Sequence, residues 1–154
     1  MGVTAPVLAR QQFLRGMRAD HLDALTQTAS EVTFPAGHRI FDDGGYVGSF
    51  WLIESGYVAL DVQVPGKRAG MIGTVGMGGL LGWSWLFPPY QWSFGAVCVT
   101  GVKALQFDAR AVRDRCEADP ALGYELTRRV SHVLAERLHG TRAKLIAEST
   151  RNQP

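Results

Sequence analysis

The residues best suited to bind a ligand gather in one stretch, Gly76 to Val97, which combines glycines, three tryptophans and a Pro-Pro pair. Glycines let a ligand or another backbone come close, and aromatic rings can line a pocket for a flat ligand. The aromatic candidates are Trp83, Trp85, Tyr90, Trp92 and Phe94. We predict a loop here, because Pro88 and Pro89 end any regular element that begins at Leu80.

The same aromatic side chains allow two other interpretations. Large aromatic residues are usually buried, so the rings could fill a former pocket and pack as core. Tryptophan and tyrosine are also favoured at protein interfaces, so they could form a patch for a partner. An open void beside residues 82–96 would favour ligand binding, and closed packing would favour the filled pocket.

Other catalytic and metal-binding motifs are missing from the sequence. The stretch GMGGLLG departs from the GxGxxG dinucleotide fingerprint, and Trp-Ser-Trp and Pro-Pro follow it instead of a helix. No Walker loop, Gly-x-Ser-x-Gly motif or pair of catalytic carboxylates is found, so we expect no enzyme activity. The four histidines, His21, His38, His132 and His139, are scattered, and we expect no metal site or haem ligand.

Composition and charge indicate an ordinary globular domain. The chain has 154 residues, 46% of them hydrophobic, and a formal net charge of +2, too small a surplus to indicate a nucleic-acid surface. No segment is long and apolar enough to span a bilayer, and the first residues lack the apolar run of a signal peptide. With only Cys98 and Cys116, we expect a cytoplasmic protein with reduced thiols.

The elements that must position this stretch are mainly short strands. Residues 19–29 have the apolar spacing of a short amphipathic helix. From residue 31 to 107 the apolar period falls to two, and Gly, Pro and Asp clusters punctuate it at short intervals. This pattern predicts a mainly β protein with flanking helices, its strands forming an antiparallel sandwich or barrel.

After Phe107 the pattern is helical again. Asp108 begins a segment that runs to Ala118, and Asp119-Pro120 provides a cap and an N1 proline for a long helix. Its apolar residues recur at three- and four-residue steps beyond 20 positions, interrupted only by Gly140. Such a helix can lie on its own barrel or pair with a second copy, and we expect a homodimer as one outcome.

With these elements in place, Phe13 to Ile146 resembles the cyclic-nucleotide-binding domain of the catabolite activator protein group of bacterial regulators. The resemblance rests on FLRGMRADHLDAL, FPAGHRIFDDGG, FWLIESGYVAL and QFDARAVRDRCEADPALGYELTRRVSHVLAERL, which follow the family's order. It implies an antiparallel β-roll, or jelly roll, with an N-terminal helical segment and a long C-terminal helix. It also implies a regulatory, cAMP-binding-like module, which the family normally attaches to an effector such as a DNA-binding helix-turn-helix, a kinase or a channel.

In that family the Gly-rich stretch is the phosphate-binding cassette, which holds a glutamate for the ribose and an arginine for the phosphate. Here Gly82 and Leu86 match, but Trp83 stands at the glutamate and Trp85 at a small residue. The arginine position holds Ser93 or Phe94. Ser84 and Ser93 are the remaining hydroxyls, and Gly95-Ala96 keeps the small end of the motif.

No arginine or lysine lies between Arg68 and Lys103. Loss of a charge-assisted bond to the phosphate costs about 1.5–3 kcal/mol, so nucleotide affinity should fall at least about ten- to hundredfold. Thr141 and Arg142 lie where family members reach the base from the last helix, and Arg142 could supply the missing cation from a neighbouring subunit.

These observations lead to two hypotheses. In the first, the chain is a stand-alone regulatory sensor without a DNA-binding domain, whose divergent cassette (Gly82 to Leu86 and Ser93 to Ala96) binds cAMP or cGMP weakly or takes another small ligand. In the second, it is a ligand-free interaction module with an aromatic-filled pocket and a protein partner. We expect residues 1–12 to be an extension, 13–149 the domain, with its β-roll at about 31–107 and its C-terminal helices at about 108–149, and 150–154 a tail.

Overall fold

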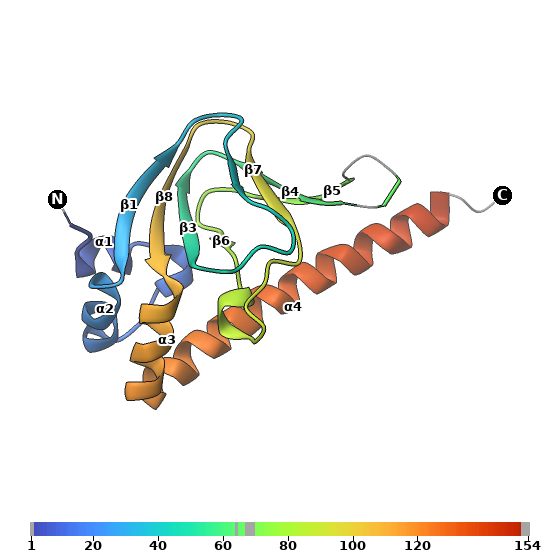
Figure 1. The fold of residues 1–154 in the computed structure, drawn as a ribbon. Helices are drawn as coiled ribbons and strands as arrows, with labels where there is room; N and C mark the ends of the chain where they lie inside the picture. The colour runs from blue at the N-terminus through green and yellow to red at the C-terminus, as the bar shows by residue number, and fades with distance from the viewer. Residues whose placement is uncertain (1, 64, 67–69, 152–154) are drawn as a thin grey trace.

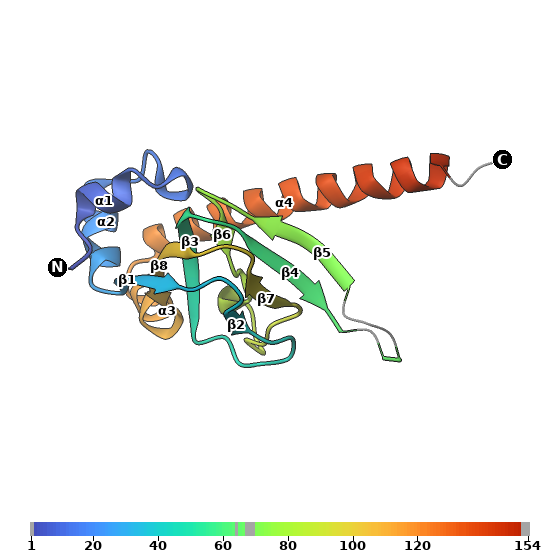
Figure 2. The same ribbon diagram turned by 90° about the horizontal axis from the view of Figure 1, so that it is seen from above.

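Two four-stranded antiparallel sheets form a β-roll (Figures 1 and 2) in the computed structural model, which describes residues 2–63, 65–66 and 70–151. The first sheet has the order β1 (Ala29–Phe34), β8 (Val102–Asp108), β3 (Ser49–Ser55) and β6 (Leu80–Leu81). The second has the order β2 (Arg39–Phe41), β7 (Gly95–Cys98), β4 (Val58–Val62) and β5 (Gly70–Val75). The predicted antiparallel β-roll is confirmed.

The core lies between the sheets and continues under the helices. Strand β3 is buried from Phe50 to Ile53 because it lies between β8 and β6 in its sheet. Strand β8 lies between β1 and β3. Its Leu105 and Phe107 side chains are 0% and 1% exposed, whereas its Lys103 is exposed to solvent. The short strands therefore close a continuous hydrophobic interior, as their period-two pattern predicted.

In the described residues, four α-helices and two 3-10 helices flank the roll. They are α1 (Ala5–Ala9), η1 (Gln12–Leu14), α2 (Ala19–Thr26), η2 (Ser84–Leu86), α3 (Ala109–Ala118) and α4 (Pro120–Arg151). The Asp108 carboxylate accepts a hydrogen bond from the Ala111 amide at 3.0 Å and caps α3. Pro120 is the first residue of α4, so both predicted helix starts are confirmed.

The long helix α4 has two unlike halves. Leu122, Leu126 and Val130 are buried in its first half, which packs against α3. Beyond Arg137 the helix runs past the β-roll in the same direction as the β4–β5 hairpin (Figures 1 and 2), and Leu138 and Leu145 are 70% and 63% exposed. Gly140 does not break the helix, since the span continues to Arg151.

Several predicted boundaries need correction. The stretch 76–97 is not one loop, because it contains β6, η2 and the start of β7. The first amphipathic helix ends at Thr26, since Ala29 already pairs with Phe107 as the start of β1. Residues 152–154 of the predicted tail lie outside the described residues.

Candidate functional site

The cassette segment, residues 82–96, runs from the end of β6 through η2 to β7. Gly82 has a φ of 101°, a backbone conformation that other residues rarely adopt, and this lets the chain turn from β6 into η2. At the other end, Gly95 and Ala96 are buried in β7 opposite β4. The segment therefore starts in one sheet and ends in the other.

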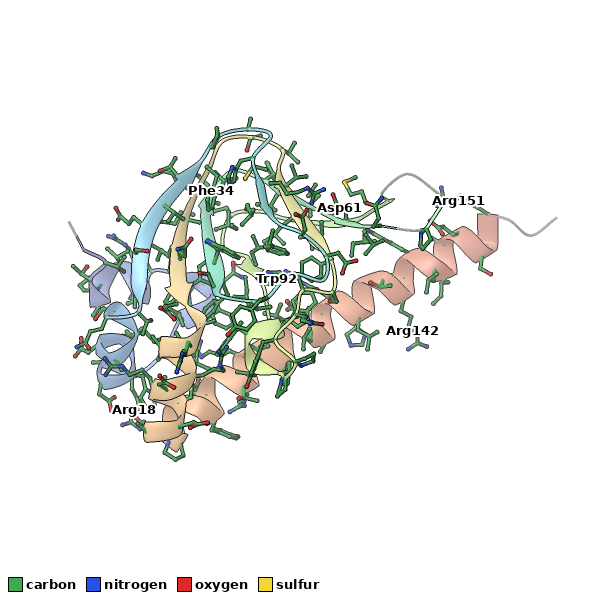
Figure 3. All side chains as sticks on the ribbon, in the orientation of Figure 1. Arg18, Phe34, Asp61, Trp92, Arg142 and Arg151 are labelled. Atoms are coloured by element: carbon green, nitrogen blue, oxygen red, sulfur yellow. The ribbon has the colours of Figure 1, made fainter. Side chains whose placement is uncertain are left out.

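Trp92 lies inside the β-roll (Figure 3) and is 4% exposed. Its ring stacks on Phe41 with the ring centroids 3.7 Å apart, and Phe94 lies tilted against both rings. A Cβ atom built on Gly82 would lie 2.8 Å from the Trp92 ring, closer than real Cβ contacts allow. The space beside Gly82 is therefore occupied by the Trp92 indole.

Trp85 is fully buried in the hydrophobic core. Its ring stacks on Phe50 at 4.5 Å, and Phe50 in turn stacks on Phe107 at 4.9 Å. From α3, Arg113 donates a hydrogen bond to the Trp85 carbonyl at 2.9 Å and lies 4.1 Å above the Tyr90 ring. The sequence analysis named Trp85 and Tyr90 as pocket-lining candidates. In the structure Trp85 contacts Phe50 and Arg113, and Tyr90 contacts Arg113.

Trp83 stands where the resemblance places a glutamate, and it meets a cation that the sequence analysis missed. Its ring tilts against Phe94 at 5.0 Å, and the Arg137 guanidinium carbon lies 4.6 Å above it. Arg137 also donates a hydrogen bond from Nη2 to the Leu80 carbonyl at 2.7 Å. Arg137 thus joins α4 to the start of the cassette segment.

The position of Arg137 on α4 explains why it reaches the roll. It continues the face that carries Leu126, Val130 and Val133, at steps of four, three and four residues. A charged residue in register with buried apolar residues was the signal that could have identified it. Burial lowers the pKa of the Arg137 guanidinium, and its Nη1 has no hydrogen-bond partner among the described residues.

The other predicted site residues lie apart from the contact between Arg137 and Trp83. Ser93 is exposed, while Ser84 and Leu86 are half-buried in η2, where the Ser84 carbonyl accepts a turn hydrogen bond from the Phe87 amide at 3.3 Å. Thr141 and Arg142 are exposed on the distal half of α4, and Arg142 projects away from the roll (Figure 3). Within one chain they do not reach the cassette, and a contact from a neighbouring subunit stays a prediction.

A groove outside the roll lies between the β5–β6 turn and α4 and has a volume of about 660 Å³. We call it the outer groove. Its α4 side carries Arg128, Arg129, His132, Val133, Glu136 and Arg137. Its other side is formed by residues 74–80, with Gln12 and Phe13 at one end. The sequence analysis did not predict it, because it depends on how α4 crosses the β5–β6 turn.

Other titratable groups lie at the corner between α3 and α4. His21 is buried with its Nε2 3.5 Å from an Asp119 carboxylate oxygen, at the corner between α3 and α4. Burial, and secondarily the Asp119 charge, raise the pKa of the Cys116 thiol to about 11, which keeps it protonated. The described part of the chain contains no cluster of three His, Cys, Asp or Glu side chains that could hold a metal, and none of its helices could cross a membrane.

Comparisons with known proteins agree with this architecture. The cyclic nucleotide-binding domain family matches residues 31–119. A CRP-like cAMP-activated global transcriptional regulator from Mycobacterium tuberculosis is 30% identical over 139 residues, which are 90% of this chain and 60% of the relative. The chain therefore spans only part of the length of that regulator.

Two solved structures show the same fold. A cyclic nucleotide-binding domain from Methylobacillus flagellatus superposes with a TM-score of 0.83 at 15% identity, covering 96% of this chain and 87% of that one. The catabolite activator protein from Thermus thermophilus gives a TM-score of 0.69 at 23% identity, covering 90% and 63%. With the family match, the β-roll and its long terminal helix, the chain belongs to the cyclic-nucleotide-binding domain family.

Proposed function

We propose that this chain is a non-enzymatic regulatory module that acts through protein contacts, with its own aromatic side chains in the place of a cyclic nucleotide. The observation that carries the proposal is the packing of Trp92 against Phe41 and Gly82, with a ring distance of 3.7 Å and a glycine that cannot accept a methyl group without displacing the indole. A nucleotide would have to expel this ring. That would also expose the aromatic surface that packs around it.

The charges of the cassette segment support the same proposal. Its positions for ribose and phosphate recognition hold Trp83 and Ser93 or Phe94, none of which can pair with a phosphate as an arginine does. The cation over the Trp83 ring is Arg137, which comes from α4 and lines the groove outside the roll. Arg113 also contacts the segment, but it already bonds the Trp85 carbonyl and lies over the Tyr90 ring. A phosphate in the roll would therefore lose solvation and could gain a charged partner only by breaking such contacts.

The surface through which the module acts is, in this proposal, the distal half of α4. Leu138, Leu145 and Ile146 are between 58% and 70% exposed on a helix that extends past the roll. Leu134, Leu138, Thr141 and Leu145 follow the alternating four- and three-residue steps of a coiled-coil seam. A second copy or another helical partner could cover this seam, and homodimerisation remains part of the proposal.

A second candidate function is a sensor that binds cAMP or cGMP weakly, or binds another small ligand. It is favoured by the family itself and by the M. tuberculosis relative, which is described as cAMP-activated. In that case Trp92 would have to move out of the roll on binding. For cAMP and cGMP the two candidates therefore differ in one measurable property, whether the nucleotide occupies the roll.

Titration of the purified chain with cAMP and cGMP to millimolar concentration tests the proposal. We expect neither a saturable change in tryptophan fluorescence nor a rise in melting temperature, because nothing displaces Trp92. The M. tuberculosis regulator is the positive control for the assay. Saturable binding at micromolar nucleotide, with a shifted melting temperature, would establish the sensor instead.

A further inference from the structure

Arg137 is a partly desolvated cation whose hydrogen bonding is incomplete. Its Nη2 donates to the Leu80 carbonyl at 2.7 Å and its guanidinium carbon lies 4.6 Å above the Trp83 ring. Its Nη1 is buried without a partner, and in the described part of the chain no carboxylate forms an ion pair with it. A buried guanidinium without an anion is unfavourable, because charged groups are normally paired when they leave water.

Arg129 lines the same groove, and unlike Arg137 it has both an ion-pair partner and backbone acceptors. Its Nε lies 2.8 Å from the Glu125 carboxylate, and its Nη1 donates to the Phe13 and Arg15 carbonyls at 2.8 and 2.9 Å. Those contacts fix the N-terminal segment to α4. Arg129 therefore has a structural role, whereas Arg137 lines the groove with one guanidinium nitrogen that has no hydrogen-bond partner among the described residues.

The outer groove has the size and chemistry of a small-molecule site. Its volume of about 660 Å³ lies within the range of roughly 300–1,000 Å³ usual for ligand pockets. Apolar side chains, among them Phe13, Val75 and Val133, line it together with Arg128 and Arg137. Its two carboxylates already have cationic or titratable partners, since Glu125 pairs with Arg129 and Glu136 lies 3.1 Å from His132.

We propose that the outer groove binds a small amphipathic anion, a carboxylate or phosphate monoester with an apolar body, whose charged end pairs with Arg137. The apolar body lies between Val75 on one side of the groove and Val133 on the other, and the exposed Arg128 adds attraction for the anion. This site lies outside the β-roll. It goes beyond the proposed function and does not depend on whether Trp92 occupies the interior.

Isothermal titration of the whole chain with octanoate and hexyl phosphate tests the site, with acetate and inorganic phosphate as probes of charge alone. We expect saturable binding of at least one amphipathic probe, at least about tenfold tighter than its short counterpart. Comparison of octanoate with hexyl phosphate distinguishes a carboxylate from a phosphate ligand. Absence of saturation for both up to about 10 mM overturns the proposal.

Arg137→Gln should weaken binding of the amphipathic probe at least about tenfold, because the anion loses its charge-assisted bond. Arg113→Gln is the matched control, since Arg113 also lies over an aromatic ring and bonds a backbone carbonyl but does not line the groove. It should bind as the unmodified chain does. Equal affinity for Arg137→Gln and the unmodified chain, or equal losses in both variants, would overturn the assignment.

Thr74→Glu provides a second variant that does not touch a buried group. Thr74 is exposed on β5 and lines the groove, so a carboxylate there should repel the anion and weaken binding several-fold while the melting temperature stays close to that of the unmodified chain. Unchanged affinity of the Thr74→Glu variant for the amphipathic probe would mean that the anion does not bind in the groove. Binding of cAMP that survives Arg137→Gln would contradict the proposed function and leave this inference intact.

Discussion

The interior of the cassette segment and the distal half of α4 are both rich in large apolar side chains, but they differ in what covers them. Trp85 and Trp92 are 0% and 4% exposed and stack on rings of the same chain, whereas Leu138 and Leu145 are 70% and 63% exposed. Apolar residues in the first region therefore stabilise the fold. Those in the second are available to another molecule.

This contrast distinguishes apolar residues that form the core from apolar residues that are exposed to a partner, which a sequence pattern alone does not distinguish. Aromatic residues in a glycine-rich stretch suggest a ligand pocket, and here the rings fill the space themselves. A helix with regular leucines suggests burial, and here half of it has no covering layer in the described chain. Substitutions in the two regions should accordingly change different observables.

The largest effect is expected for Trp85→Ala, which removes a fully buried indole stacked on Phe50. We expect a loss of about 3–5 kcal/mol in the free energy of unfolding, measured by urea denaturation. Trp85→Phe is the matched variant and should cost much less, because it keeps a ring and removes an indole N–H that has no partner among the described residues. A cost under about 1 kcal/mol for the alanine variant would mean that the cassette interior is not a packed core.

Gly82→Ala should have the next largest effect. The added methyl would meet the Trp92 ring at 2.8 Å, at a φ of 101° that alanine rarely adopts. We expect about 1–3 kcal/mol of destabilisation, with a change in tryptophan emission as the indole shifts. Gly140→Ala, on α4 with open space around its Cβ position, is the control and should be neutral or stabilising. A stable Gly82→Ala variant with unchanged emission would contradict the closed interior.

The same substitution at two leucines of α4 should separate the halves of the helix. Leu126→Ala should cost about 2–5 kcal/mol because Leu126 is 1% exposed. Leu145→Ala should change the unfolding free energy of the dilute chain by less than about 0.5 kcal/mol. If the distal seam self-pairs, Leu145→Ala should weaken dimerisation at least about tenfold in analytical ultracentrifugation. A monomeric unmodified chain would assign the seam to a different partner.

The smallest effect concerns the thiol of Cys116. Burial and the Asp119 charge raise its pKa to about 11, so at pH 8 only a small fraction is thiolate, and iodoacetamide should react more slowly than with a free cysteine. The rate should rise as the pH approaches 11, and the chain unfolded in urea should react at the ordinary rate. Cys98→Ala isolates the signal of Cys116. Rapid alkylation at pH 8 would mean that the α3–α4 corner opens easily.

Much of the fold could be predicted because it depends on local signals. The period-two strands, the Asp108 cap and the proline at the start of α4 each follow from neighbouring residues, and the structure has them. The stretch 76–97 was harder, since Leu80 and Leu81 become a strand only by pairing with β3. Such a two-residue strand has no periodicity of its own to detect.

The candidate site was predicted less completely. The sequence identified Trp83, Trp85 and Trp92 as the unusual residues, but it could not tell lining from filling, because that depends on where Phe41 and Phe50 place their rings. The sequence favoured Arg142 as the cation from the last helix, whereas Arg137 is the α4 arginine that contacts the cassette segment. The helix register relative to the roll decides between them, and no local residue pattern specifies it.

The length of α4 has a mechanical consequence. Its 32 residues correspond to a rod about 48 Å long, attached to the roll only along its first part. About 14 of these residues follow Arg137 and form an arm of about 21 Å, so a tilt of about 10° at that point would move the far end by about 4 Å. Arg137 is the last residue of α4 that is not exposed, and it bonds the Leu80 carbonyl, so a change in its contacts would be carried along the free arm to the tip. The helix can therefore act as a lever arm for the domain.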